Sequence, residues 1–262
     1  MTAWPEGYDR VLLGKVDSTM AESARRAPDL RRPTWMLAKR QTAGRGRRGR
    51  VWASPAGNFA ATLAMRPTEP PAVVALRSFV AALALHDAFS EAVGGAGDFA
   101  LKWPNDVLLN GGKVAGILLE NFARGGAFCN LAIGFGANLA EAPELDSLEP
   151  GALRPVSLKG ETGRRVVPED FLEMLAFAYA DREANFATFG FGPIRAAWLA
   201  RAARLGEPVA ARTPSGETCG VFETVDETGA LILATGRGRA AIAAAEVHFP
   251  DRRSATAIGR TG

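Results

Sequence analysis

The central hairpin of the predicted sheet lies in residues 102–120, which read Lys102-Trp-Pro-Asn-Asp-Val-Leu-Leu-Asn-Gly-Gly-Lys-Val-Ala-Gly-Ile-Leu-Leu-Glu120. Two apolar runs, Val107–Leu109 and Val114–Leu119, flank Asn110-Gly-Gly112. An Asn-Gly pair between apolar runs is a strong hairpin signal, because both residues tolerate the positive φ that a tight turn needs. Pro104 fits a strand end, because proline cannot donate a hydrogen bond inside a sheet. We therefore predict a β-hairpin with polar residues at one end.

The polar residues of this hairpin are of types that bind anions or hydrated cations. Asn105 and Asp106 carry the oxygen ligands that suit a hydrated Mg²⁺. Lys113 begins the second strand, so a rigid element aims its ammonium. Strict alternation puts the Gly116 position on the face opposite to Lys113. Because glycine has no side chain, Gly116 can instead offer its backbone where a ligand comes close. Taken alone, these residues also fit an exposed turn lysine and an ordinary Asn–Asp turn.

An arginine–glycine loop precedes the hairpin and reads Gln41-Thr-Ala-Gly-Arg-Gly-Arg-Arg-Gly-Arg-Val-Trp52. We expect its glycines to take positive φ and to expose backbone amides. Guanidinium groups match phosphate and carboxylate geometry bidentately. The loop is therefore predicted to close over a polyanion with its three glycines and four arginines, which are Gly44, Gly46, Gly49, Arg45, Arg47, Arg48 and Arg50.

This loop has three competing interpretations. An Arg/Gly-rich composition is more often a sign of RNA contact or disorder than of catalysis. No Gly-Lys-Ser/Thr follows, so the loop is not a Walker A motif, and Gly44–Gly49 matches GxGxxG without the helical pattern of a dinucleotide-binding fold. The net charge is only +3, and residues 141–149 are acidic. This charge distribution favours local anion recognition over a broad surface for nucleic acid.

The segments around these motifs predict an α+β domain over residues 1–204 with a largely antiparallel sheet. Two of the expected helices, Pro168–Phe189 and Pro193–Ala203, each begin with a proline, which is favoured in the first turn. The expected strands are Thr34–Lys39, Asn58–Met65 and Phe128–Phe135, and the expected helices are Pro70–Ala92, Pro168–Phe189 and Pro193–Ala203.

From residue 205 the pattern changes to short strands and turns, which predicts a small β-barrel over residues 205–250 followed by a polar, disordered tail at 251–262. The expected strands are Pro208–Arg212, Val221–Val225, Ala230–Ala234, Arg239–Ala243 and Val247–Phe249.

Composition limits the class of protein. A chain of 262 residues with 47% hydrophobic residues can bury a core without disulfides or a structural metal. Cys129 and Cys219 are far apart, and the cysteine and histidine spacings assemble no metal site. No apolar run reaches the roughly 18–20 residues that cross a bilayer. No signal peptide is apparent, so we expect a cytoplasmic protein that does not bind a membrane.

The motifs together resemble those of biotin–protein ligases, whose signatures are GRGRRGR-x-W and KWPND followed by K-x-AGIL-x-E. They stand here as Gly44–Trp52, Lys102–Asp106 and Lys113–Glu120, in the family's order and spacing. The resemblance also takes in Asp17-Ser-Thr19 and Ile133-Gly-Phe-Gly-Ala-Asn138. It covers nearly the whole chain.

The resemblance implies a fold as well as an activity. The fold is class II synthetase-like (the biotin–lipoyl ligase fold), with a mixed, largely antiparallel sheet, flanking helices and a C-terminal SH3-like β-barrel over Pro208–Phe249. The activity is ATP-dependent formation of biotinyl-5′-AMP, followed by transfer of biotin to a lysine. Biotin and ATP would be the substrates, and Mg²⁺ would accompany ATP. The natural partner is the carrier domain of a biotin-dependent carboxylase, and both monomers and homodimers occur in the family.

Site residues are carried over only where this sequence matches the family's motifs. The implied catalytic residues are Lys113, Arg45, Arg47 and Asp106. Asp106 is expected either to accept the proton of the carrier lysine or to serve Mg²⁺. The implied biotin-binding residues are Ser18, Thr19, Met20, Gln41, Arg45, Gly46, Arg47, Lys113 and Gly116, and the implied nucleotide-binding residues are Arg45, Arg47, Arg48, Trp52, Asn105, Lys113 and Asn138.

Two positions depart from the family's pattern. Met20 stands where the family usually has Asn, which weakens a polar role for that side chain. Val51 replaces a residue that is often basic and reduces the charge of the loop.

Many bacterial relatives begin with a DNA-binding helix-turn-helix domain that represses biotin genes. This chain reaches Asp17-Ser-Thr19 almost at once, so we expect neither DNA binding nor repression. Lipoate–protein ligase is the nearest rival, because it shares the fold class and the chemistry, but the long loop and Lys102–Asp106 favour biotin. A nucleic-acid-binding protein that uses Arg45–Arg50 is the alternative from another class.

Overall fold

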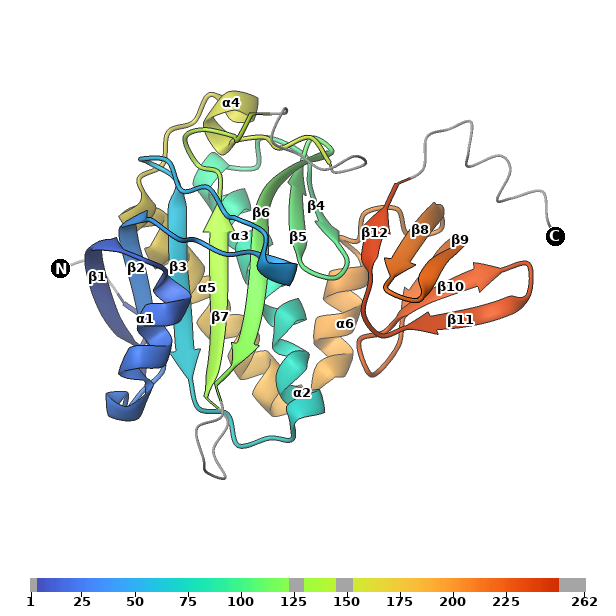
Figure 1. Ribbon diagram of the computed structural model, residues 1–262, viewed down its shortest axis with the longest axis horizontal. Coiled ribbons are helices and arrows are strands. Elements are labelled where there is room, and N and C mark those ends of the chain that lie inside the picture. The colour runs from blue at the N-terminus through green and yellow to red at the C-terminus, as the bar shows by residue number, and fades with distance from the viewer. Residues whose placement is uncertain (1–3, 123–129, 145–152, 250–262) are drawn as a thin grey trace.

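The protein is described here by a computed structural model that covers residues 4–122, 130–144 and 153–249. Its larger sheet has seven strands in the order β1-β2-β3-β7-β6-β5-β4 (Figure 1). β1 and β2 run parallel, whereas the remaining neighbours pair antiparallel. The prediction of a mixed, largely antiparallel sheet is confirmed. The strands are β1 Asp9–Val16, β2 Thr34–Gln41, β3 Phe59–Met65, β4 Phe99–Lys102, β5 Asp106–Leu109, β6 Gly112–Asn121 and β7 Leu131–Ala137.

Helices cover both faces of this sheet. The two longest, α3 and α5, pack on one face and α1 packs on the other (Figure 1). The helices are α1 Thr19–Arg26, α2 Pro71–Ala75, α3 Arg77–Val93, α4 Leu158–Thr162, α5 Pro168–Phe189 and α6 Phe191–Leu199, with short 3-10 turns η1 Ala27–Asp29 and η2 Arg47–Gly49.

Several helix boundaries differ from the sequence prediction. The helix expected over Pro70–Ala92 is divided at Leu76 into α2 and α3. α3 ends at Val93 and is capped by Gly94, which adopts the left-handed conformation (φ 61°) that glycine tolerates without steric cost. α5 has the predicted bounds. α6 begins at Phe191, two residues before the proline that was expected to open it, and it ends at Leu199 rather than Ala203.

The main core lies between the sheet and the layer of α3 and α5. Alternation along β3 sends Phe59 and Leu63 into this core, while Thr62 faces α1. Trp35 of β2 packs against Phe135 of β7 at a ring separation of 5.2 Å. The opposite face of the sheet, under α1 and the arginine loop, carries small and polar residues such as Ala60, Thr62 and Gly134 beside the buried Met36.

One helical stretch of the described residues, Pro71–Val93, is long and apolar enough to cross a membrane by composition alone. Its most apolar window is 67% buried inside the protein. Val80, Leu83 and Leu85 are fully enclosed between the sheet and α5. These contacts identify the stretch as a core helix.

The second sheet has five antiparallel strands in the order β11-β10-β9-β8-β12, as expected for a small SH3-like barrel (Figure 1). The Trp103 indole donates a hydrogen bond of 3.0 Å to the Gly229 carbonyl and so ties the two sheets together. The division at residue 204 stays a prediction, and the tail at 251–262 lies outside the described residues. The strands are β8 Pro208–Thr213, β9 Gly216–Val225, β10 Leu231–Thr235, β11 Gly238–Ile242 and β12 Glu246–His248.

Candidate functional site

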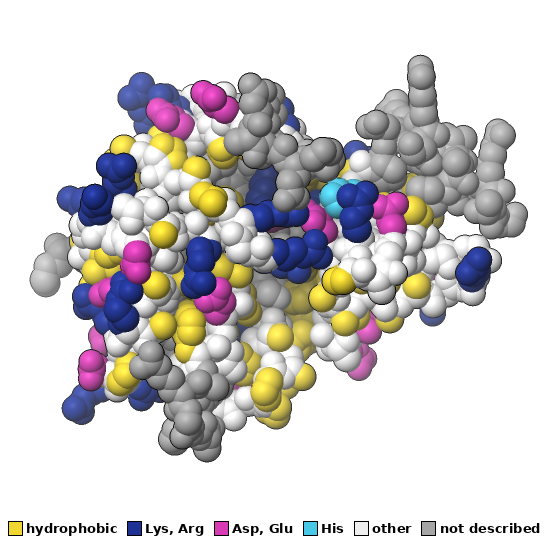
Figure 2. Space-filling view, in the orientation of Figure 1, with side chains coloured by type: hydrophobic (Ala, Val, Ile, Leu, Met, Phe, Trp, Pro, Cys, Tyr) yellow, Lys and Arg dark blue, Asp and Glu magenta, His cyan; other side chains and the backbone are white. Residues whose placement is uncertain are grey.

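A cavity of about 620 Å³ lies between the sheet, the arginine loop and the end of β12. Figure 2 shows Lys and Arg side chains gathered where the main body meets the C-terminal sheet. The structure brings every predicted site residue to the lining of this one cavity. These residues are Ser18, Thr19, Met20, Gln41, Arg45, Gly46, Arg47, Arg48, Trp52, Asn105, Asp106, Lys113, Gly116 and Asn138.

One end of the cavity is a hydrogen-bonding pocket at the start of α1. The Thr19 amide and hydroxyl both donate to the Gln41 side-chain oxygen, at 2.8 and 3.1 Å. Thr62 of β3 donates to the Thr19 hydroxyl at 2.8 Å, and the Gln41 amide donates to the Ser54 hydroxyl at 3.2 Å. The Gln41 amide has a second hydrogen, so it can still donate to a ligand. Ser18 caps α1, where its hydroxyl accepts from the Met20 amide at 3.2 Å.

Glycines on β6 and β7 form the floor of the cavity. A Cβ at Gly136 would lie 2.3 Å from the Trp52 indole, and one at Gly134 would lie 2.8 Å from the Met20 sulfur. Real Cβ atoms do not approach other atoms so closely, so both glycines leave the space that these side chains fill. Met20, in place of the family's usual Asn, therefore acts here as an apolar wall packed on the sheet.

Lys113 and Gly116 share one face of β6, which contradicts the prediction from strict alternation. A β-bulge interrupts the β5–β6 pairing, because Val107 pairs with Ala115 while the next residue, Leu108, pairs with Lys113. The extra residue resets the alternation of side chains. A Cβ at Gly116 would consequently lie 3.6 Å from the Lys113 ammonium. The lysine is thus aimed over the glycine floor.

A charged row crosses the sheet beside this floor. Lys102 of β4 pairs in register with Asp106 of β5, which pairs with Gly116 of β6, which pairs with Gly136 of β7. One Asp106 oxygen lies 2.7 Å from the Lys113 ammonium, and the other lies 3.6 Å from the Lys102 ammonium. A single buried carboxylate therefore holds two lysines.

Burial and ion pairing shift the pKa values of this row in ways that bear on the chemistry. Burial would raise the pKa of Asp106, but Lys113 and Lys102 outweigh it and hold the pKa below its ordinary value. Burial also lowers the pKa of Lys102, although Asp106 opposes that effect. Burial likewise lowers the pKa of Arg47. Three cations thus surround one carboxylate, so the row carries a net positive charge that suits an anionic ligand.

The contacts of Asp106 favour neither of the two roles expected for it. A carboxylate with a lowered pKa is a weak base, and both of its oxygens face ammonium groups, which would repel Mg²⁺. The Asn105 amide is also engaged, since its oxygen accepts from Arg47 at 3.1 Å and its nitrogen donates to the Ile117 carbonyl at 2.8 Å. In this structure Asn105 and Asp106 orient cations of the protein, and a role of this pair toward Mg²⁺ stays a prediction.

The arginine loop is a short hairpin-like turn. The Trp52 amide donates to the Gly44 carbonyl at 2.9 Å, and the Gly46 amide donates to the Arg50 carbonyl at 2.7 Å. The expectation of positive φ holds for Gly49 (φ 74°) but not for Gly44 or Gly46. Arg48 takes the left-handed conformation instead (φ 57°). Gly44 is needed for space, because a Cβ there would lie 2.6 Å from the Trp52 carbonyl oxygen.

The four loop arginines have three partners among the described residues, because Arg48 and Arg50 share one carboxylate. Arg45 pairs with Glu120 of β6 at 3.3 Å. Arg50 donates two hydrogen bonds, of 2.7 and 2.9 Å, to the Glu246 carboxylate of β12. Arg48 donates one of 3.0 Å to the same carboxylate. Arg50 holds the pKa of Glu246 down at about 2. Arg47 hydrogen-bonds the neutral Asn105 amide, so it is the loop arginine best placed to bind a ligand anion.

Asn138 lies at the end of β7 and is 3% exposed. Its amide nitrogen donates to the Val156 carbonyl at 3.1 Å, and its oxygen accepts a longer hydrogen bond of 3.5 Å from Asn58. These bonds make Asn138 a support of the cavity wall.

Sequence reasoning missed several residues that complete the site. Lys102 lies within the motif Lys102–Asp106. A lysine and an aspartate at the two ends of a short turn could have indicated that the two side chains pair. Glu246 could not be found in this way, because it lies 196 residues from Arg50 in the sequence. The residues missed are Ser54, Thr62, Lys102, Glu120, Glu246 and Phe249.

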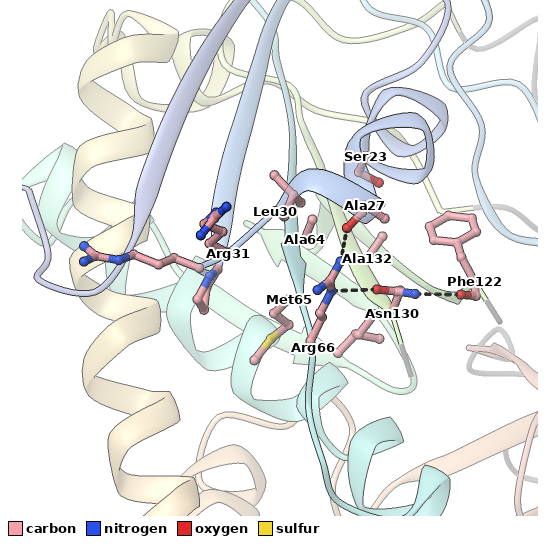
Figure 3. Close-up of a pocket in the computed structure, with 13 residues that line it drawn as sticks. Ser23, Ala27, Leu30, Arg31, Ala64, Met65, Arg66, Phe122, Asn130 and Ala132 are labelled. Carbon is pink, nitrogen blue, oxygen red and sulfur yellow. Dashed lines mark hydrogen bonds between the residues drawn. The ribbon is translucent and has the colours of Figure 1, made fainter. Parts of the chain in front are cut away.

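A second, smaller cavity of about 160 Å³ lies at the opposite end of β3 and β7 (Figure 3). Arg66 donates to the Asn130 oxygen at 3.1 Å and also to the Ala27 carbonyl. The Asn130 amide in turn donates to the Phe122 carbonyl at 3.2 Å. The polar groups at the centre of this smaller cavity therefore hydrogen-bond to each other, which is typical of a network that stabilises the fold.

Comparison with known proteins agrees with this geometry. Residues 13–138 match the biotin/lipoate A/B protein ligase family, and residues 205–249 match the biotin protein ligase C terminal domain. A biotin–[acetyl-CoA-carboxylase] ligase of Paracoccus denitrificans is 57% identical over 238 residues, which are 91% of this chain and 99% of that protein. A bifunctional ligase/repressor of Bacillus subtilis is 33% identical over 82% of this chain and 66% of its own length.

A solved structure supports the same assignment. A biotin protein ligase from Aquifex aeolicus, in complex with biotin and ATP, superposes with a TM-score of 0.79 at 26% identity. The match covers 91% of this chain and 97% of that one. With the relative from Paracoccus denitrificans matched over almost its full length, this chain belongs to the biotin protein ligase family.

Proposed function

We propose that this chain joins biotin to a lysine of a carrier protein in two steps at the 620 Å³ cavity. In the first step, a biotin carboxylate oxygen attacks the α-phosphorus of ATP, and the bond to pyrophosphate breaks. In the second, the neutral amine of the carrier lysine attacks the carbonyl carbon of biotinyl-5′-AMP, a C–N bond forms, the C–O bond to AMP breaks, and one proton of the amine is released. The observation that carries the proposal is the row of Lys113, Asp106 and Lys102 beside a glycine-floored pocket.

The bicyclic ring of biotin is assigned to the end of the cavity near α1. Its ureido group can hydrogen-bond with Thr19 and Gln41, whose hydrogen-bond network with Thr62 fixes their orientation. The flat ring and its aliphatic chain suit the floor over Gly116 and Gly134. The Met20 wall supplies apolar contact there, as burial of the biotin chain requires.

Arg47 and Lys113 are assigned to the point where the biotin carboxylate meets the α-phosphate of ATP. A carboxylate and an α-phosphate repel each other, and fixed cations offset that repulsion while holding the attack in line. Lys113 is suited to this task because Asp106 fixes its ammonium 2.7 Å away. Trp52 encloses the same region, with its indole on the floor glycines. Asp106 is thus a positioning residue in this proposal.

Mg²⁺ is expected to arrive with ATP and to be held by its phosphate oxygens, since Asn105 and Asp106 are engaged by cations of the protein. The ion supplies charge neutralisation of the phosphate chain when it is bound. The lysines and arginines of the cavity offset the remaining negative charge of the substrates.

The second step needs a neutral amine, although a free lysine has a pKa near 10.4. The net positive charge of the cavity lowers the pKa of an incoming lysine, because like charges disfavour the protonated form. Closure of the arginine loop excludes water from the mixed anhydride until the carrier arrives. The proposed carrier is the biotin carboxyl carrier domain of a biotin-dependent carboxylase, and the proposed compartment is the cytoplasm.

Ligand-dependent exchange of labelled pyrophosphate into ATP tests the first step without any carrier. Exchange with biotin, and none with lipoate, is the expected result. Exchange with lipoate alone would support lipoate ligation. No exchange with either acid, together with salt-dependent binding of DNA or RNA, would support the nucleic-acid alternative.

A further inference from the structure

Within the charged row of Lys102, Asp106 and Lys113, the buried Lys102 is the cation to which the proposed mechanism assigns no contact with a substrate. Its residue is 8% exposed, and the side chain lines the same cavity as Lys113. A lysine almost never occupies such a position without an ionic partner. Asp106 is that partner in this structure, but at 3.6 Å and with the carboxylate more closely engaged by Lys113 at 2.7 Å.

The surroundings of Lys102 place it at one definite end of the cavity. Cross-strand register orders the row from Gly136 through Gly116 and Asp106 to Lys102. Directly paired residues of neighbouring strands are adjacent on the sheet. Lys102 therefore lies at the end farthest from the Trp52 floor, against the Phe249 ring, whose centroid is 5.7 Å from its ammonium.

Among the described residues at that end of the cavity, cations outnumber carboxylates. Among the described residues that line it, Glu246 is already shared by Arg48 and Arg50. Asp106 is shared by Lys102 and Lys113. Of the described residues that line the cavity, Asp106 and Glu246 are the two carboxylates, whereas six are Lys or Arg. A ligand group with several negative charges would balance this end, whereas a single carboxylate would not.

On the basis of the proposed function, we propose that Lys102 binds the β- and γ-phosphates of ATP, the part that leaves as pyrophosphate. The biotin carboxylate and the α-phosphate lie over Lys113, next to the glycine floor. The phosphate chain then extends along the row toward Lys102 and the C-terminal sheet. Phosphate oxygens compete for the Lys102 ammonium more strongly than the 3.6 Å contact with Asp106, which stays with Lys113.

Calorimetric titration of the full chain distinguishes this role from a structural one. The probes are an ATP analogue with a methylene bridge between its α- and β-phosphates, AMP, and biotin, each titrated into wild type and Lys102→Met. Methionine keeps the length of the side chain and its contact with Phe249 but removes the charge. A lost hydrogen bond to a charged group predicts about 10- to 100-fold weaker binding of the triphosphate analogue. AMP and biotin are expected to bind within about threefold of wild type, since their anions lie over Lys113.

Two further variants serve as controls. Lys15→Met removes an exposed lysine of β1 and is expected to change no affinity. Lys102→Gln provides a second neutral replacement if Lys102→Met does not fold, as judged by thermal unfolding.

Three results would be contrary to the proposal. An equal loss for the triphosphate analogue and AMP would show that Lys102 acts only through Asp106 on Lys113. Unchanged affinity for the analogue would remove Lys102 from phosphate binding, and weaker binding of biotin alone would move it to the carboxylate. If wild type binds neither biotin nor the analogue, the proposed function fails first, which separates the two failures.

Discussion

The ion pairs of Glu246 predict that the C-terminal sheet restrains the arginine loop, and Glu246→Gln tests this directly. Glu246 holds Arg50 through two hydrogen bonds of 2.7 and 2.9 Å, and it holds Arg48 through one of 3.0 Å. The side chains are partly exposed, at 23% for Glu246 and 44% for Arg50, so each arginine is credited with about 1 kcal/mol, the upper end for an exposed pair. The total of about 2 kcal/mol corresponds to about a 30-fold increase in the open loop population.

Limited proteolysis with trypsin measures this population, because the loop contains four arginines that trypsin can cut only when it opens. Cleavage under fast opening and closing follows the equilibrium population of the open form. We expect the rate of cleavage in residues 45–50 to rise by about 30-fold in Glu246→Gln. The matched control is Glu217→Gln, which removes a carboxylate paired with Arg212 on the surface of the same small sheet. An unchanged rate, or an equal rise in Glu217→Gln, would refute the restraint.

The same ion pairs predict a pH dependence. The folded pKa of Glu246 is lowered to about 2, below the ordinary value near 4.5, chiefly by Arg50. A depressed pKa means that the contact contributes fully above about pH 4.5 and is lost as the pH falls toward 2. Trypsin is inactive at such low pH, so it cannot measure loop opening there. Hydrogen exchange of the loop amides, measured by mass spectrometry, is the suitable method. Glu246→Gln is expected to abolish this pH dependence.

Three further changes test other parts of the site. Lys113→Ala removes the cation at the meeting point of the two substrates, so biotin-dependent pyrophosphate release should fall by about 10²–10³-fold, and near-normal release would exclude Lys113 from the chemistry. Arg47→Gly should keep some adenylate synthesis but release free biotinyl-AMP into solution, whereas retention as tight as in wild type would contradict the closing role of the loop. Gly136→Ala puts a methyl group 2.3 Å from the Trp52 indole, so urea denaturation should show a loss of about 1–3 kcal/mol in unfolding free energy. Unchanged stability would show that Trp52 does not lie on that glycine.

Local signals accounted for much of the fold. Asn110 and Gly111 adopt the positive φ values (49° and 78°) that the predicted hairpin turn requires. α5 has the predicted bounds because Pro168 starts it and its apolar residues recur at helical spacing. β1 and β4 were missed. β1 pairs in parallel with a strand that begins 25 residues later, and β4 is four residues long, so neither has a strong local signal.

The candidate site, like the fold, has a part that local sequence signals predict and a part that they do not. Motifs identified the residues that line the cavity, because their types and spacing are written in the sequence. The β-bulge that turns Lys113 and Gly116 to one face depends on pairing between β5 and β6, which alternation alone does not reveal. The partners of the loop arginines depend on tertiary structure, since Glu120 and Glu246 come from distant strands. Roles that depend on such partners, including that of Asp106, cannot be derived from the motifs alone.

The most direct test of the proposed function follows both steps in one reaction. Purified protein is incubated with MgATP and an apo carrier domain, with either biotin or lipoate, and the intact mass of the carrier is measured. We predict the mass gain of one biotinyl group with biotin, no gain with lipoate, and no gain when Lys113→Ala replaces wild type. An unmodified carrier in the presence of biotin, or a carrier modified by lipoate instead, would contradict the account.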